Sequence, residues 1–181
     1  SHDQWANTVG AVNTIVSEGP KLTGHNTDSY GFIKSLKENA GFVPEGKSVL
    51  ILGTGGAARA AAFGLVNEMV QSITIANRTL RRAKLLEKDL RSLNACVNVI
   101  PMEQCALATV VPHVQLIVNA TPIGMSHTGT KNHIPLPIHM ISPKTLVYDM
   151  VYSPIETQLL VEAREAGAQI MSPAKITKIS N

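Results

Sequence analysis

The chain has 181 residues, of which 44% are hydrophobic, 16% charged and 4% aromatic, with a formal net charge of +3. This composition indicates a globular protein of one full domain with part of a second, and an aliphatic core of the kind found around buried parallel sheets. The dispersed and mildly positive charge argues against nucleic-acid binding, and the apolar runs are too short to cross a membrane.

The first strand-like segment is 9–16, and the turn residues 17–20 are expected to end it. Asn13 lies in the middle of this segment. A buried amide needs partners, because an unsatisfied one costs about 1–3 kcal/mol. Two interpretations stay open for Asn13: a structural residue bonded to a neighbouring loop, or a donor and acceptor directed at a polyol or carboxylate ligand.

A polar loop at 24–31 leads into an amphipathic helix, with Asp28 at the start of that helix. Spacing alone favours Thr27 or Asp28 as the helix N-cap over a catalytic carboxylate at Asp28. A glycine ends the helix, and a proline and a further glycine then mark a linker, which predicts a boundary near residue 43.

The segment that follows contains a glycine-rich turn. Four consecutive apolar residues, 49–52, predict a strand buried on both faces, and an alanine-rich helix comes directly after the glycines. Gly53, Gly55 and Ala58 match the G-x-G-x-x-G/A fingerprint, which combines a tight turn, room for a pyrophosphate and close helix packing. A strand-to-helix turn without a ligand would use the same residues, so the fingerprint alone leaves both interpretations open.

From residue 46 onward, strand-like and helix-like segments alternate, which predicts an open α/β domain. The right-handed crossover rule then indicates a doubly wound Rossmann-type parallel sheet of about six strands. We expect strands near 48–52, 72–76, 97–100, 115–119, 145–149 and 168–171, and helices near 56–69, 79–92, 102–109 and 156–166.

The second strand of this sheet favours one cofactor. NAD-binding versions of the fold have an acidic residue near its end, whereas here the strand runs into Asn77, Arg78 and Thr79. The guanidinium groups of Arg78 and Arg82 suit a phosphate, and Asn77 and Thr79 can add neutral hydrogen bonds. We therefore expect NADP(H) rather than NAD(H), the alternative being a basic helix start exposed to water.

Two later loops are expected at the same edge of the sheet. Residues 119–125 follow the fourth strand, where the strand order reverses and ligands bind in such sheets, although a plain turn would tolerate the same small residues. After the fifth strand, Tyr152 could face a substrate, and Asp149 could equally be a buried structural acceptor.

Cys96 and Cys105 have no C-x-x-C spacing and no neighbouring histidine pair, so they predict buried free thiols and no metal site. Residues 1–5 are polar and lack the pattern of a secretory leader. Together these features predict a cytoplasmic protein.

Taken together, six motifs resemble the shikimate dehydrogenase family, with matching order and approximate spacing from Ala6 to about Met171. Six motifs in sequence are far more specific than any one of them. They are Gly10-Ala11-Val12-Asn13-Thr14, Gly24-x-Asn26-Thr27-Asp28-x-x-Gly31, Gly53-x-Gly55-Gly56-Ala57, Asn77-Arg78-Thr79, Asn119-Ala120-Thr121 and Asp149-Met150-x-Tyr152.

The resemblance implies NADP-dependent reduction of 3-dehydroshikimate to shikimate, a step of aromatic amino-acid biosynthesis. It implies that Asn13, Asp28 and Tyr152 line the shikimate pocket, with Asp28 taking part in proton transfer. The implied cofactor residues are Gly55, Gly56 and Ala57 at the pyrophosphate, Asn77, Arg78, Thr79 and Arg82 at the adenosine phosphate, and Thr121 and Met150 near the nicotinamide.

Two departures from the family pattern qualify this expectation. The family's catalytic lysine and carboxylate-binding serines belong to a substrate domain that precedes the first motif, and its substrate-binding glutamine lies on a helix with no recognisable equivalent after Met171. We therefore expect 1–43 to be a remnant of the substrate-binding domain with a hinge helix, and 44–181 to be the NADP-binding domain.

A chain built in this way is expected to have weak or no activity alone, and to self-associate through the surface that the absent domain would cover. Two alternatives remain at this point: a non-catalytic NADP-binding regulatory relative, and a quinate dehydrogenase.

Overall fold

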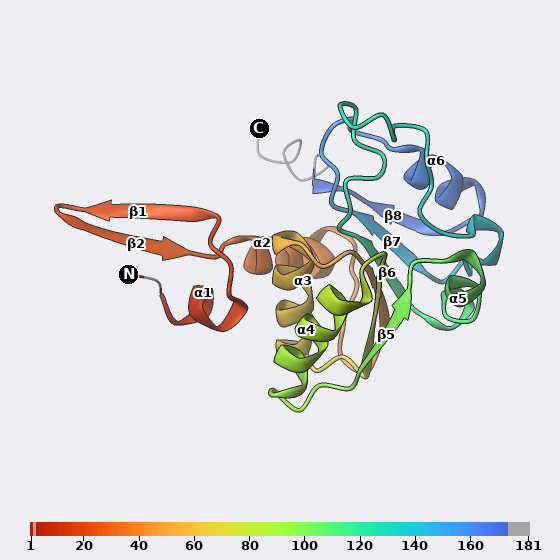
Figure 1. Cartoon of the computed structure of the whole chain (residues 1–181). Coiled ribbons are helices and arrows are strands. Elements are labelled where there is room, and N and C mark those ends of the chain that lie inside the picture. The colour runs from red at the N-terminus through yellow and green to blue at the C-terminus, as the bar shows by residue number, and fades with distance from the viewer. Residues whose placement is uncertain (2, 174–181) are drawn as a thin grey trace.

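A six-stranded parallel sheet forms the centre of the computed structural model, which describes residue 1 and residues 3–173 (Figure 1). The strand order is β5-β4-β3-β6-β7-β8, and every neighbouring pair is parallel. This order is that of a doubly wound Rossmann-type sheet and confirms the predicted fold class. The strands are β3 (Ser48–Leu52), β4 (Ser72–Asn77), β5 (Val97–Pro101), β6 (Leu116–Asn119), β7 (Leu146–Asp149) and β8 (Gln169–Met171).

Strand β3 shows why the apolar run 49–52 is continuous. Val49 and Ile51 belong to one hydrophobic cluster, and Leu50 and Leu52 belong to the cluster on the other face of the sheet. Successive side chains of a strand point to opposite faces, so a sheet covered on both sides requires apolar residues at every position.

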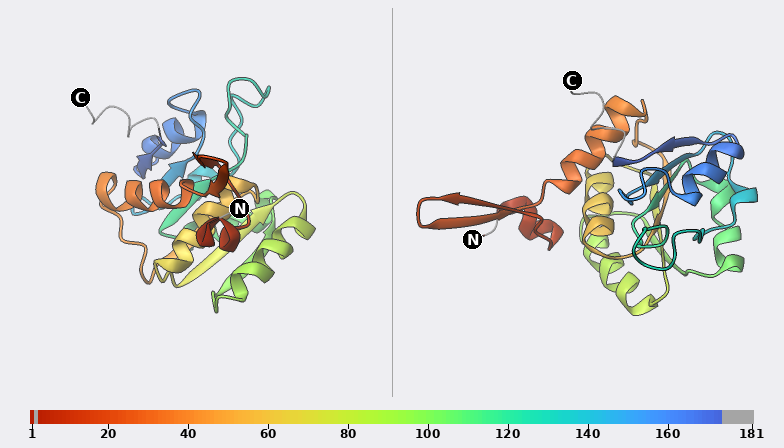
Figure 2. Two further views of the ribbon diagram at one scale, coloured as in Figure 1. Left: turned by 90° about the vertical axis from the view of Figure 1, so that its left-hand side faces the viewer. Right: turned by 90° about the horizontal axis from the view of Figure 1, so that it is seen from above.

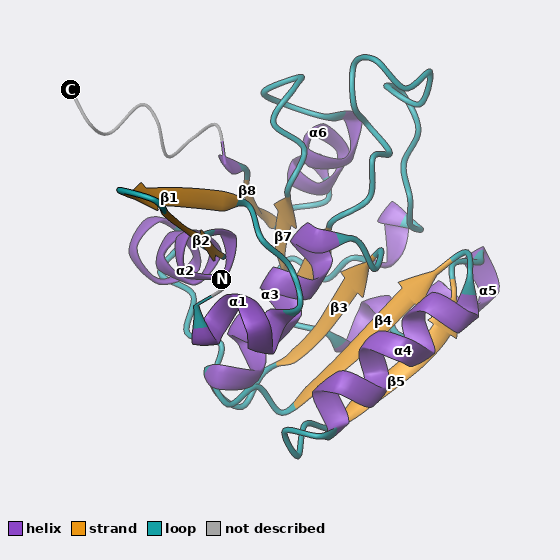
Figure 3. Ribbon diagram, turned by 60° about the vertical axis from the view of Figure 1, so that its left-hand side comes forward, coloured by secondary structure: helices purple, strands orange, loops and turns teal. Residues whose placement is uncertain are grey.

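Helices cover both faces of the sheet, as Figure 3 shows. The cluster on one face contains residues of α2 (Asp28–Lys34), α3 (Gly56–Asn67) and α4 (Leu80–Arg91), and the other contains residues of α5 (Gln104–Ala108) and α6 (Gln158–Glu165). The four helices expected after residue 46 have the predicted positions to within two residues at each end. Short 3₁₀ turns occur at Val111–His113 and Ile138–Met140.

The first 25 residues differ from the prediction. They form helix α1 (Gln4–Val9) and a hairpin of β1 (Thr14–Glu18) and β2 (Lys21–His25) that projects away from the body of the molecule (Figure 2). The predicted strand at 9–16 is therefore wrong at its start, because Asp3 caps α1 and Gly10, with φ +68°, ends it. The turn of the hairpin is correspondingly confined to residues 19 and 20.

Helix α2 continues directly into a π-helix, Ser35–Asn39, which the sequence did not indicate. In the residues that the structure describes, no helix is long and apolar enough to cross a membrane. Cys96 and Cys105 are unpaired but both are exposed, so the expectation of buried thiols is wrong. The expected lack of a helix after Met171 concerns residues 174–181, which lie outside the described residues.

Candidate active site

The carboxyl ends of four adjacent strands form one row across the sheet. Leu52 of β3 lies opposite Ala76 of β4 and Asn119 of β6, and Asn119 lies opposite Asp149 of β7. The strand ends, loops and helix starts at this row contain every cofactor-binding residue expected from the sequence. The strand order reverses between β3 and β6, and ligands of such sheets bind at that reversal.

The glycine-rich turn after β3 is shaped for close approach. Gly53 has φ +104°, and a Cβ built on it would lie 2.9 Å from the Ala120 carbonyl oxygen, so a larger residue is excluded. Gly55 and Gly56 are exposed, and a Cβ on either would contact nothing within 4 Å. No side chain caps the start of α3. No side chain therefore occupies the first-turn amides of α3, and this helix start has room for a pyrophosphate.

The turn after β4 presents two arginines. Arg78 and Arg82 are exposed, and neither takes part in an ion pair within the described part of the chain. The first turn of α4 contains no acidic residue. The Asn77 side chain donates to the Thr79 carbonyl at 2.9 Å, so this amide shapes the turn that presents the arginines. The arrangement suits a phosphate group.

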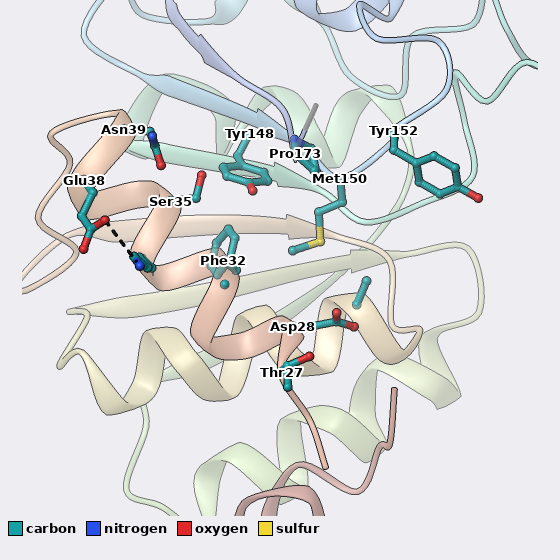
Figure 4. Close-up of a pocket in the computed structure, with 13 residues that line it drawn as sticks. Thr27, Asp28, Phe32, Ser35, Glu38, Asn39, Tyr148, Met150, Tyr152 and Pro173 are labelled. Carbon is teal, nitrogen blue, oxygen red and sulfur yellow. Dashed lines mark ion pairs between the residues drawn. The ribbon is translucent and has the colours of Figure 1, made fainter. Parts of the chain in front are cut away.

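A pocket of about 680 Å³ lies between α2 with its π-helical extension and the end of β7 (Figure 4). It brings together residues that are far apart in the sequence. Asp28, Met150 and Tyr152 all line it, and Ala57 links it to the glycine-rich turn. Its full lining is Thr27, Asp28, Gly31, Phe32, Lys34, Ser35, Glu38, Asn39, Ala57, Tyr148, Met150, Tyr152 and Pro173.

Asn13 lies next to this pocket without lining it. The residue is exposed, and its Oδ1 accepts a hydrogen bond from the Thr27 backbone amide at 3.0 Å. Its Nδ2 donates to the Thr27 hydroxyl at 3.2 Å. Thr27 therefore makes no side-chain cap, contrary to one expectation, and Asn26 Oδ1 accepts from the Ser29 amide at 3.3 Å instead. The contacts hold Asn13 beside the residue that precedes Asp28.

Asp149 is fully buried and does not line the pocket. It accepts hydrogen bonds from Asn119 Nδ2 (2.9 Å), the Val151 amide (3.0 Å) and the Thr157 hydroxyl (2.6 Å). Burial raises the pKa of this carboxyl above 3.8, and the hydrogen bonds oppose the shift. Asp149 is thus a buried structural acceptor, as the sequence analysis allowed.

Thr121 is held by the same network. Its backbone amide and hydroxyl both donate to Asn119 Oδ1, at 3.1 and 2.7 Å. The connecting function of Asn119 was not predicted from the sequence. A polar residue at the end of an otherwise apolar strand was the available signal.

The packing of α2 on α3 was also missed, and it positions Asp28. A Cβ on Gly64 of α3 would lie 2.7 Å from Ser29 Oγ and 3.0 Å from Ile33 Cγ1. The two helices are therefore so close that only glycine fits, which brings the start of α2 next to Ala57. A glycine inside a predicted helix is a signal of close packing.

The inner wall of the pocket is aromatic. The rings of Phe32 and Tyr148 meet edge to face, with centroids 4.9 Å apart. Burial raises the pKa of the Tyr148 hydroxyl above 10.0. Within residues 1 and 3–173, no cluster of histidine, cysteine or acidic side chains is arranged to hold a metal ion.

Comparison with known proteins agrees with this geometry. Residues 36–130, more than half of the chain, match the model of the shikimate / quinate 5-dehydrogenase family. The chain belongs to this family. Two shikimate dehydrogenases (NADP(+)) are similar to it: that of Moorella thermoacetica is 42% identical over 171 residues, and that of Desulforamulus reducens is 40% identical over 169.

The match covers these shikimate dehydrogenases only in part. It includes 94% and 92% of the present chain but 57% of each relative, so the chain spans little more than half their length. The solved shikimate 5-dehydrogenase of Listeria monocytogenes, in complex with shikimate and NAD, superposes with a TM-score of 0.86 at 31% identity. That superposition covers 97% of this chain and 62% of the Listeria chain.

Proposed function

We propose that this chain is part of an NADP-dependent shikimate dehydrogenase, which reduces 3-dehydroshikimate to shikimate in aromatic amino-acid biosynthesis. The observation that carries the proposal is the single pocket lined by Asp28, Met150 and Tyr152 and joined through Ala57 to the glycine-rich turn. A cofactor bound at that turn would extend toward the end of β7, where the side chains proposed to contact the substrate lie. Residues 1–43 would then belong to the substrate side and 44–181 to the cofactor side.

NADP(H) is the proposed cofactor. The exposed backbone at Gly55, Gly56 and Ala57 would hold the pyrophosphate, close to the tight turn at Gly53. Arg78 and Arg82, with Asn77 and Thr79, would hold the adenosine phosphate. Thr121 and Met150 would lie near the nicotinamide. The cofactor, when bound, supplies the hydride that reduces the substrate ketone.

The chain's own residues would orient the substrate and move the proton. Asn13 and Tyr152 carry donors and acceptors suited to a polyol acid, and the carboxyl of Asp28 would exchange a proton with the substrate oxygen. Among the described residues, Lys34 is the lysine that lines the pocket, and it pairs with Glu38 at 3.9 Å on the exposed side of α2. This position does not correspond to the catalytic lysine of the family. We therefore expect a polypeptide of these 181 residues to have weak or no activity alone.

The protein is proposed to act in the cytoplasm on a small-molecule substrate. Its unpaired and exposed cysteines support a reducing compartment. Self-association through exposed apolar residues is a further proposal, and its test is given in the Discussion.

The proposal is tested by measuring binding of NADPH and NADH through nicotinamide fluorescence, and turnover through reduced-nicotinamide absorbance with NADP⁺ and either shikimate or quinate. We expect NADPH to bind more tightly than NADH, and any turnover to be faster with shikimate than with quinate. Asp28→Asn is expected to lower that turnover by about 10²–10⁴-fold with NADPH affinity unchanged. Absence of NADPH binding would refute the proposal, and preference for quinate would correct the substrate.

A further inference from the structure

Arg59 of α3 joins three separate parts of the molecule. Its Nε donates to the Val9 carbonyl at 2.7 Å, and its Nη1 contacts the Asp89 carboxylate of α4 at 2.9 Å. The guanidinium carbon lies 5.4 Å from the centre of the Phe63 ring. The Arg59 side chain is 22% exposed, whereas its partner Asp89 is 46% exposed, so the ion pair lies at the edge of the surface. Arg59 does not line the pocket, so contact with a ligand in the pocket does not explain its position.

The contact at Val9 closes the end of helix α1. Carbonyl groups in the last turn of a helix have no partner within the helix, and Arg59 supplies one. Gly10 follows with φ +68°, and a Cβ on it would lie 3.0 Å from Arg59 Nη2. Gly10 therefore provides both the left-handed conformation and the space that the guanidinium occupies.

A series of hydrogen bonds leads from this point to the pocket. The Ala11 carbonyl accepts from Asn26 Nδ2 at 3.1 Å, and Asn13 Oδ1 accepts from the Thr27 amide at 3.0 Å. Asn26 and Thr27 directly precede Asp28. The segment 9–13 is thus fixed at one end by Arg59 and at the other by the loop that carries Asp28.

The backbone of Arg59 lies next to the glycine-rich turn. Arg59 lies three residues after Gly56, the first residue of α3, and its amide donates to the Gly55 carbonyl at 2.9 Å. We propose that Arg59 is a positioning residue that holds segment 9–13 against the cofactor helix, and so keeps Asn13 and Asp28 in register with the glycine-rich turn. The role of this register in catalysis rests on the proposed function. The attachment of segment 9–13 to α3 by Arg59 does not depend on that function.

Trp5 offers a direct readout of this attachment. It is the only tryptophan of the sequence, it lies on α1, and it packs against the main hydrophobic cluster. Its emission reports whether α1 is docked on α3. Energy transfer from Trp5 to bound NADPH reports how far α1 lies from the cofactor.

The test compares Arg59→Gln and Arg59→Lys with the unchanged chain. Glutamine removes the charge and the multi-donor fork, whereas lysine keeps the charge and loses the fork. Arg164→Gln is the matched control, because the ion pair of Arg164 with Glu156 is on the surface and remote from α1. Gly10→Ala is a second perturbation of the same contact, because its methyl group would crowd Nη2 at 3.0 Å and alanine is strained at φ +68°.

We expect Arg59→Gln and Gly10→Ala to shift Trp5 emission to the red and to lose energy transfer, with NADPH affinity and cooperative thermal unfolding retained. Arg59→Lys should lie between these variants and the unchanged chain, and Arg164→Gln should match the unchanged chain. Unaltered Trp5 emission in both Arg59→Gln and Gly10→Ala would overturn the proposal. A parallel loss of NADPH affinity and folding in both would also overturn it, because it would show a general structural role.

The two proposals fail in different ways. If the unchanged chain binds no NADPH, the proposed function fails, and the emission of ligand-free Trp5 still decides whether Arg59 holds α1.

Discussion

Asn119 donates a hydrogen bond from Nδ2 to the buried carboxylate of Asp149 at 2.9 Å, joining the carboxyl ends of β6 and β7. The Thr157 hydroxyl donates to the other oxygen of the same carboxylate at 2.6 Å. Asn119 Oδ1 accepts from Thr121. One buried network therefore positions the two loops proposed to flank the nicotinamide, those containing Thr121 and Met150.

This network predicts a pH dependence of stability. The folded pKa of Asp149 is raised above the ordinary value of 3.8 because its carboxyl is buried. An acid with a raised folded pKa binds a proton more readily in the folded protein. Its contribution to stability is complete below 3.8 and is lost as pH rises through the folded pKa. We expect the free energy of unfolding of the unchanged chain, relative to Asp149→Asn, to increase as pH falls from neutral toward 3.8.

Urea unfolding at a series of pH values measures this difference. Glu103→Gln is the control, since Glu103 is exposed, and its curve should run parallel to that of the unchanged chain. Parallel curves for the unchanged chain and Asp149→Asn would contradict the prediction.

Gly64→Ala should destabilise the protein. The added methyl group would lie 2.7 Å from Ser29 Oγ, and α2 would have to move away from α3. Overpacking of this kind costs about 1–3 kcal/mol. Gly31→Ala is the matched control on α2, because a Cβ there contacts nothing within 4 Å. It should stabilise by about 0.5–1 kcal/mol through helix propensity. Equal unfolding midpoints for the two variants would show that the helix contact is not tight.

Arg78→Ala should weaken NADPH and leave NADH almost unaffected. A hydrogen bond to a charged group is worth about 1.5–3 kcal/mol, so the loss in NADPH affinity should be about 10- to 150-fold. Arg81→Ala is the control, because Arg81 is an exposed arginine in the first turn of α4, close to Arg78 in the sequence, with no proposed contact to the phosphate. Fluorescence titration with both cofactors decides the matter, and equal losses for NADPH and NADH would remove Arg78 from the phosphate site.

The projecting hairpin predicts self-association. Ile15 and Leu22 lie on the same face of the hairpin and are 69% and 57% exposed. A two-stranded ribbon with an apolar face and unpaired edges favours pairing with another strand. We expect sedimentation to show concentration-dependent association that Ile15→Lys reduces. A monomer at all concentrations would count against this proposal.

The sequence pattern was sufficient to predict the structure of a segment where that structure depends on the segment's own residues. The run 49–52 predicted a strand covered on both sides, and β3 has this environment. Asp3 and Gly10 are capping residues that could have indicated α1. Val9 and Gly10 were instead included in the strand predicted at 9–16. Cysteine burial was wrong because residue type gives an average tendency, whereas exposure depends on what packs over each position.

The sequence by itself determined the order of the elements, the glycine-rich turn, the basic turn after β4 and the motifs that place the chain in its family. These features depend on neighbouring residues, and backbone geometry and charge act over that range. Only the tertiary structure decided that Asp149 is a buried acceptor, that Gly64 admits α2 and that Arg59 reaches Val9. Each of these depends on the distance between segments 8 to 50 residues apart, and that distance is set by packing of the whole fold.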